Sequence, residues 1–128
     1  MKAQGADWTL TFRRLSDALR GAPEAARAQF ATPAAFDAWQ TDWRARVETG
    51  PGTAEDTALA MDRVNPLVIP RNHTVEAALD AAVAGDAAPF EALLSAISAP
   101  YAETAGQEAF ILPPPQGFAE EYRTFCGT

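Results

Sequence analysis

Ten prolines, placed between positions 23 and 115, constrain the fold of this 128-residue chain more than any other feature. Proline has no backbone N–H and its ring clashes with the preceding helical turn, so a helix accepts it only in its first turn. The prolines therefore predict short elements separated by rigid breaks. Three consecutive prolines at 113–115 exclude both a helix and a central strand, and they predict an extended segment over 110–115.

Between the breaks, apolar residues recur every three or four positions, which is the spacing of one helix face. The clearest such face contains Trp39 and Trp43, which are therefore predicted to be core aromatics rather than a stacking platform. Arg13 falls off the apolar face of the first helix. The predicted helices cover residues 7–20, 32–50, 53–65, 72–84 and 86–100, with a further short helix over 23–30.

Several residues mark where these helices begin and end. Thr53 followed by Asp56 resembles a capping box, with Asp in place of the usual Glu. Gly85 lies where a left-handed residue would end one helix, and Asp86 lies where it would cap the next.

These patterns predict an all-α fold of about five short helices in one compact unit, with an extended, proline-rich C-terminal tail. A chain of 128 residues is long enough to form one core without a metal or a disulfide. We therefore expect a single helical domain over 1–128, in which residues 108–128 form the tail.

The net charge of −7 is concentrated in the second half, where residues 51–128 carry 11 acidic and 3 basic side chains. Such a charge repels phosphate groups, so neither a nucleic acid nor an anionic membrane is expected as a partner. No apolar run reaches the roughly 20 residues of a transmembrane helix, and the N-terminus has no apolar signal core. A cytoplasmic location of the bacterial type is expected.

The residues needed for a complete active site are missing from the sequence. No glycine-rich phosphate-binding loop is present, and the one lysine is Lys2. A zinc site needs three or four ligands, and one histidine with one distant cysteine is too few. Adjacent carboxylates, such as Glu55 and Asp56, diverge by about 100° on a helix. We therefore predict no catalytic, cofactor-binding or metal-binding residues in this chain.

Five residues are candidates for a structural role. Asn65, Pro66, Arg71, Asn72 and His73 form a structural connector, in which polar side chains can satisfy loop carbonyls and amides. His73, the one histidine, is expected to cap or hydrogen-bond at the start of its helix.

Cys126 is the one cysteine, so the chain cannot form an internal disulfide. It is either an accessible thiol that can exchange and oxidise or a buried, inert one.

Three stretches are distinctive together: residues 7–15 (DWTLTFRRL), residues 61–73 with Met61 and NPLVIPRNH, and residues 122–128 (YRTFCGT). With Gly85-Asp86 and Pro100-Tyr101 between them, they resemble the C-terminal region of the selenoprotein O family, the YdiU-like protein adenylyltransferases. The resemblance follows the same order and covers nearly the whole chain.

This resemblance implies a larger protein. Family members are several times longer and resemble protein kinases (pseudokinases), but they transfer AMP from ATP to Ser, Thr or Tyr hydroxyls. Their ATP and Mg²⁺ sites lie in the kinase-like part, upstream of the region matched here, so no residue of this chain inherits a catalytic role. Since Met1 falls inside the family's helical region, the chain is expected to be a fragment that supports the upstream kinase-like domain and is inactive alone.

The family's terminal cysteine implies a redox role for Cys126, with a partner in the upstream part or in another molecule. The alternative function is a free-standing helical protein-interaction module without enzymatic activity. A small metal-dependent hydrolase is disfavoured because the ligands are too few. A chain cut from a larger domain would also self-associate through exposed apolar surface.

Overall fold

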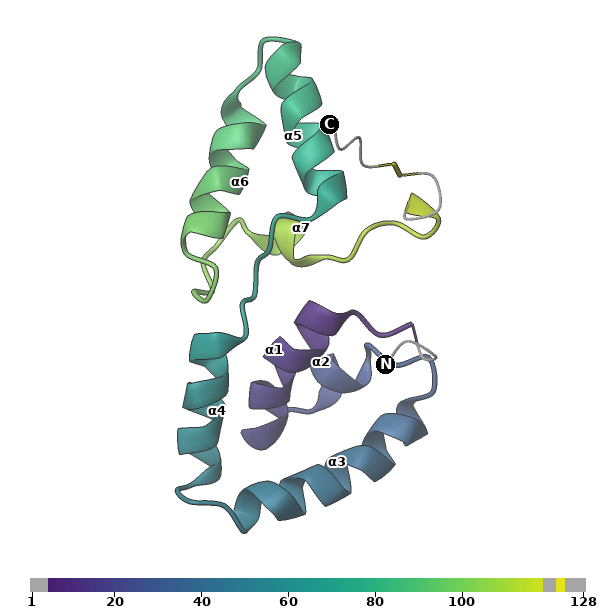
Figure 1. Cartoon of the computed structure of the whole chain (residues 1–128), viewed down its shortest axis with the longest axis vertical. Coiled ribbons are helices and arrows are strands. Elements are labelled where there is room, and N and C mark those ends of the chain that lie inside the picture. The colour runs from purple at the N-terminus through teal and green to yellow at the C-terminus, as the bar shows by residue number, and fades with distance from the viewer. Residues whose placement is uncertain (1–4, 119–121, 124–128) are drawn as a thin grey trace. The chain divides into compact units, whose positions relative to one another are not determined.

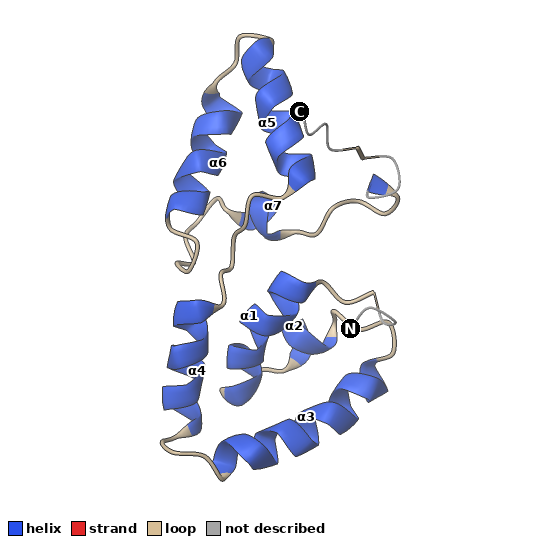
Figure 2. Ribbon diagram, viewed as in Figure 1, coloured by secondary structure: helices blue, strands red, loops and turns tan. Residues whose placement is uncertain are grey.

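The computed structural model describes residues 5–118 and 122–123, and these residues form helices and no strands (Figures 1 and 2). The predicted all-α class is confirmed, and the five longer helices match five of the predicted ones. The seven helices of the described residues are α1 (Trp8–Leu19), α2 (Glu24–Arg27), α3 (Pro33–Glu48), α4 (Ala54–Val64), α5 (Asn72–Val83), α6 (Ala88–Ser98) and α7 (Glu108–Ile111).

The helix boundaries follow from the predicted caps. The Thr53 side chain accepts from the N–H of Asp56, whose carboxylate in turn accepts from the N–H of Thr53 at 2.9 Å, so the capping box is confirmed. Gly85 has a φ of +96°, a conformation that side-chain-bearing residues rarely adopt. The N-cap of α6 is Ala87, so the prediction of Asp86 as the cap is wrong by one residue; Asp86 Oδ1 still accepts from the N–H of Ala88 at 3.0 Å.

The prediction that residues 110–115 are extended is wrong at its first two residues. Phe110 and Ile111 belong to the single-turn helix α7, and the chain becomes extended at Leu112, with φ −63° and ψ 142°. The reason is that Pro113 restricts the residue directly before it and leaves earlier residues free to be helical. Within the predicted tail, the N–H of Tyr122 also donates to the carbonyl of Phe118 at 2.9 Å, a helical spacing.

The described residues group into two compact units, where the sequence analysis expected one. Unit 1 contains the residues up to Leu67 together with Tyr101–Glu103, and unit 2 contains Val68–Pro100 together with the residues from Thr104 onward.

The core of unit 1 is built from α1, α2 and α3. Leu15, Ala26 and Phe36 are buried together. Partly buried apolar side chains pack against them, namely Phe12, Phe30, Trp43 and Met61.

Trp39 lies outside this core, so the prediction of a core residue is wrong. It is 46% exposed, and its ring stacks on Trp43 with centroids 5.3 Å apart and planes 11° from parallel. Of the sixteen residues of α3, all of them described, Phe36 alone is buried. The neighbouring α2 has four residues, about 6 Å of helix, and cannot cover an α3 that is about 24 Å long.

A cluster of charged side chains joins α1 to α4 in unit 1. Asp62 of α4 pairs with Arg13 at 3.2 Å and with Arg20 at 2.9 Å, and Ser16 donates to its Oδ1 at 2.5 Å. Arg13 also donates to the Asp62 backbone carbonyl at 3.1 Å. Arg13, which lies off the apolar face of α1, is nevertheless buried, because these bonds replace the water that its guanidinium loses.

Unit 2 is a helical hairpin in which α5 and α6 run antiparallel, joined by residues 84–87 (Figure 1). Ala78, Leu93 and Ala96 are its buried apolar residues on these helices. The open end is closed by a hydrogen bond from the N–H of Val68 to the carbonyl of Pro100 at 3.2 Å. Among the described helices of both units, none is long and apolar enough to cross a membrane.

Candidate functional site

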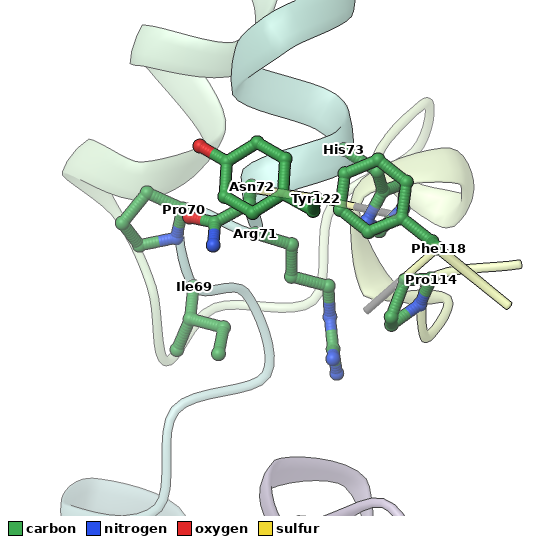
Figure 3. Close-up of a pocket in the computed structure, with 8 residues that line it drawn as sticks. All are labelled: Ile69, Pro70, Arg71, Asn72, His73, Pro114, Phe118 and Tyr122. Atoms are coloured by element: carbon green, nitrogen blue, oxygen red, sulfur yellow. The ribbon is translucent and has the colours of Figure 1, made fainter. Parts of the chain in front are cut away.

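A hollow of about 470 Å³ lies at the start of α5 in unit 2 (Figure 3). Two segments distant in sequence form its walls. The first supplies Ile69, Pro70, Arg71, Asn72 and His73, and the second supplies Pro114, Phe118 and Tyr122. Arg71, Asn72 and His73, three residues of the predicted connector, therefore line the hollow.

Arg71 is the residue that starts the helix here. Its backbone is extended, with φ −77° and ψ 137°, and its carbonyl accepts from the N–H groups of Thr74 and Val75, both at 3.0 Å. The Thr74 hydroxyl donates to the same carbonyl at 2.8 Å. These three bonds to the carbonyl form the first turn of α5, and the charged Arg71 side chain is buried.

His73 contacts the second segment through its ring. The imidazole meets the Phe118 ring at a centroid distance of 5.7 Å and an angle of 71°, an edge-to-face geometry. Its Nδ1 is buried and has no hydrogen-bond partner among the residues that the structure describes, so Nδ1 does not make the bond expected for a capping role. Burial and then the charge of Arg71 lower the pKa of His73, so the ring stays neutral at pH 7.

Tyr122 completes this wall of the hollow. Its ring stacks on Phe118 with centroids 5.0 Å apart, and its hydroxyl donates to Glu76 Oε1 of α5 at 3.2 Å. Desolvation and the Glu76 carboxylate raise the pKa of Tyr122, so the phenol remains protonated and keeps donating.

The lining of the hollow mixes charged, polar and apolar groups. The polar groups of the walls are one guanidinium, one amide, one imidazole and one phenol hydroxyl, and no carboxylate lies among the eight lining residues. Among the described residues, no group of three His, Cys, Asp or Glu side chains is placed to hold a metal ion.

A second hollow, of about 290 Å³, lies between α6 and the segment that carries α7. Small residues of α6, such as Ala92 and Ala96, face Gln107, whose side chain is buried. The Gln107 amide nitrogen contacts the Thr104 hydroxyl, while its Oε1 has no hydrogen-bond partner in the described part of the chain. No titratable side chain lines this hollow.

The five residues predicted as a connector separate into two places. Asn65 ends α4 in unit 1, where its N–H donates to the Met61 carbonyl at 2.9 Å, and Pro66 follows it. Arg71, Asn72 and His73 start α5 and line the first hollow. Their structural role stays a prediction. Cys126 lies outside the residues that the structure describes.

The sequence analysis missed the aromatic wall of the hollow. Phe118 and Tyr122 lie 45 and 49 positions beyond His73, and they were assigned to an extended tail. Phe118 and Tyr122 are four positions apart, a spacing that is typical of side chains on one side of a helical turn and that the sequence analysis did not use.

No protein-family model matches the chain. A protein nucleotidyltransferase YdiU from Cereibacter sphaeroides (strain KD131) is 52% identical over 128 residues, which is 100% of this chain and 25% of that protein. The YdiU proteins of Rhizobium johnstonii and of Mycobacterium sp. (strain KMS) are 52% and 51% identical over 133 and 122 residues, or 26% and 24% of their lengths. The chain thus spans about a quarter of the length of these curated relatives. It is a relative of the YdiU protein nucleotidyltransferases and corresponds to their C-terminal quarter, as the sequence resemblance predicted.

Proposed function

We propose that this chain acts as the C-terminal helical portion of a YdiU-type protein adenylyltransferase, an enzyme that transfers AMP from ATP to protein hydroxyl groups. The observation that carries the proposal is the identity of about one half along the whole chain with proteins named for nucleotidyl transfer. In this proposal the chain supports the kinase-like domain and contributes no catalytic residue.

The chemistry of AMP transfer determines which part of the protein binds ATP and Mg²⁺ in this proposal. Transfer of AMP requires groups that hold the ATP phosphates and Mg²⁺, and this sequence has no phosphate-binding loop. ATP and Mg²⁺ are therefore proposed to bind the remaining three-quarters of such a protein. The proposal also includes a cytoplasmic location, because the reaction needs ATP as the donor of AMP.

The supporting role rests on contacts that fix two helical surfaces. Arg13 and Arg20 hold α4 to α1 through Asp62 in unit 1. In unit 2, Phe118 and Tyr122 hold the later segment against α5. Cys126 is proposed to serve redox control through a thiol partner outside this chain.

A chimera tests the proposal. The C-terminal quarter of the Cereibacter sphaeroides relative is replaced by this chain, and transfer of label from ATP carrying ³²P at the α-phosphate to protein is measured. The parent protein is the positive control, and the 128-residue chain alone is the negative one. We expect the chimera to transfer AMP at a rate similar to that of the parent. A folded chimera without transfer, or a parent that transfers no AMP, would refute the proposal.

The alternative is a free-standing helical interaction module, and the behaviour of exposed apolar side chains in unit 1 separates the two candidates. Trp8 and Val64 are 68% and 69% exposed. If the chain is one portion of a larger protein, these side chains lack their natural cover, and the isolated chain should self-associate or bind a hydrophobic dye. Sedimentation as a clean monomer without dye binding would favour the free-standing module.

A further inference from the structure

The hairpin of unit 2 exposes four large apolar side chains. Leu79 and Val83 of α5 and Phe90 and Leu94 of α6 are between 42% and 91% exposed, with Val83 the most exposed of them. Large apolar side chains that gather on one surface of a soluble protein usually mark a contact site, whereas scattered ones need no explanation.

Helix geometry places all four on the same face of the hairpin. Leu79 directly follows the buried Ala78, and Leu94 directly follows the buried Leu93, so each leucine is rotated by about 100° from the buried side in the same sense. In two antiparallel helices that bury facing sides, rotations of the same sense lead to the same face. Val83 and Phe90 lie four residues from the leucines and extend this face along each helix.

The charged side chains of the hairpin itself all have one sign. Residues 72–100 contain four carboxylates and no lysine or arginine. Three of them lie three residues before an apolar member of the face, and therefore on the same side of the helix. They are Glu76 before Leu79, Asp80 before Val83, and Glu91 before Leu94.

We propose that this face, defined by Leu79, Val83, Phe90 and Leu94, docks on an apolar surface edged by arginine or lysine in the part of the YdiU-family polypeptide outside this chain. The proposal rests on the proposed function and adds the surface through which support is given. The relatives carry about three times as much further sequence, which provides a cover in the same molecule. Carboxylates around an apolar contact favour a basic partner rim.

A second copy of the chain is a poorer occupant. Pairing two such faces would bring the acidic borders of both copies together, and like charges placed opposite each other oppose association. Self-association of the isolated chain would instead use exposed apolar residues of unit 1.

Photo-crosslinking in the full-length Cereibacter sphaeroides relative tests the proposal. Benzoylphenylalanine is placed at the position aligned with Val83 and, in a second variant, at the position aligned with Phe90, where an aromatic ring replaces an aromatic ring. The matched control carries it at the position aligned with Ala77, which directly precedes Ala78 and so lies on the opposite side of α5. Mass spectrometry then locates each cross-link.

We expect both face positions to cross-link within one molecule to residues outside the aligned 128, and the control to give at most a small fraction of that product. A cross-link to the region aligned with residues 1–67, a dimer-sized product, or equal products from face and control would overturn the proposal, as would no product from either face position. The proposed function is judged separately by AMP transfer in the unmodified relative. A protein that cross-links as expected yet transfers no AMP refutes the function and leaves the docking face standing.

Discussion

Replacing Phe36 by alanine tests the description of the unit 1 core. Phe36 is fully buried against Leu15 and Ala26, and its ring lies 5.2 Å from that of Phe30. Removing a fully buried phenylalanine side chain costs about 3–5 kcal/mol through lost transfer energy and the cavity left behind. A unit of this size has a stability of roughly 3–10 kcal/mol, so Phe36→Ala should remove a large part of it.

Trp39→Ala is the matched control on the same helix face. The Trp39 side chain is 46% exposed, so about half of its surface is buried, and its ring lies 5.3 Å from that of Trp43 and 6.0 Å from that of Phe36. Scaling the usual cost of losing a core aromatic by that fraction gives roughly 1.5–2.5 kcal/mol. Trp39→Ala is therefore predicted to cost less stability than Phe36→Ala, although tryptophan is the larger residue.

Urea unfolding measures both variants. All three tryptophans lie in unit 1, so their fluorescence reports this unit in Phe36→Ala, and far-UV circular dichroism follows Trp39→Ala, which loses one fluorophore. With a slope of about 1–1.5 kcal/mol per molar urea, the Phe36→Ala midpoint should fall by roughly 2–5 M, or the unit should be unfolded without urea. A Trp39→Ala variant at least as destabilised as Phe36→Ala would refute the reasoning.

Three further predictions concern single residues. Burial acts to raise the pKa of Asp62, but hydrogen bonds from Ser16 and Arg20 outweigh burial, and the pKa is lowered. The ionised Asp62 carboxylate therefore stabilises the fold above the ordinary carboxyl pKa of about 3.9, and this stabilisation is lost as the pH falls below that value. Asp62→Asn should therefore cost about 1–3 kcal/mol at pH 7 and flatten the acid limb of a stability–pH curve; an unchanged curve contradicts this. Thr53→Ala, which removes the cap of α4, should cost about 1 kcal/mol in thermal unfolding, and no change would mean that the cap is not formed in solution. Cys126 should react with a thiol reagent under native conditions, and reaction only after denaturation would indicate a packed, structural cysteine.

The sequence was sufficient for features that depend on neighbouring residues. The capping box at Thr53, the left-handed Gly85 and the five longer helices depend on contacts within a few positions, where propensity and spacing carry the information. The family resemblance was likewise readable from short motifs.

The errors arose where distant residues decide the outcome. Phe36 and Trp39 have the same spacing signal, but whether each is buried depends on how much of α3 the neighbouring helices cover. Periodicity predicts which side of a helix is apolar and does not predict the length of the element that covers it. Arg13 is buried because Asp62, 49 positions later, supplies both a carboxylate and a carbonyl.

Residues distant in sequence also decide the lining of the candidate site. Arg71, Asn72 and His73 were identified together because they are adjacent in sequence. Their partners Phe118 and Tyr122 reach them through the fold, and the neighbouring prolines masked the helical spacing of the two rings.

Titration calorimetry of ATP–Mg²⁺ into the 128-residue chain tests the central claim most directly, which is that nucleotide chemistry belongs to the part of a YdiU-type protein outside this chain. The full-length Cereibacter sphaeroides relative, titrated under the same conditions, is the positive control. The account predicts binding by the relative and no detectable heat of binding by the chain. Micromolar affinity of the isolated chain for ATP would contradict it.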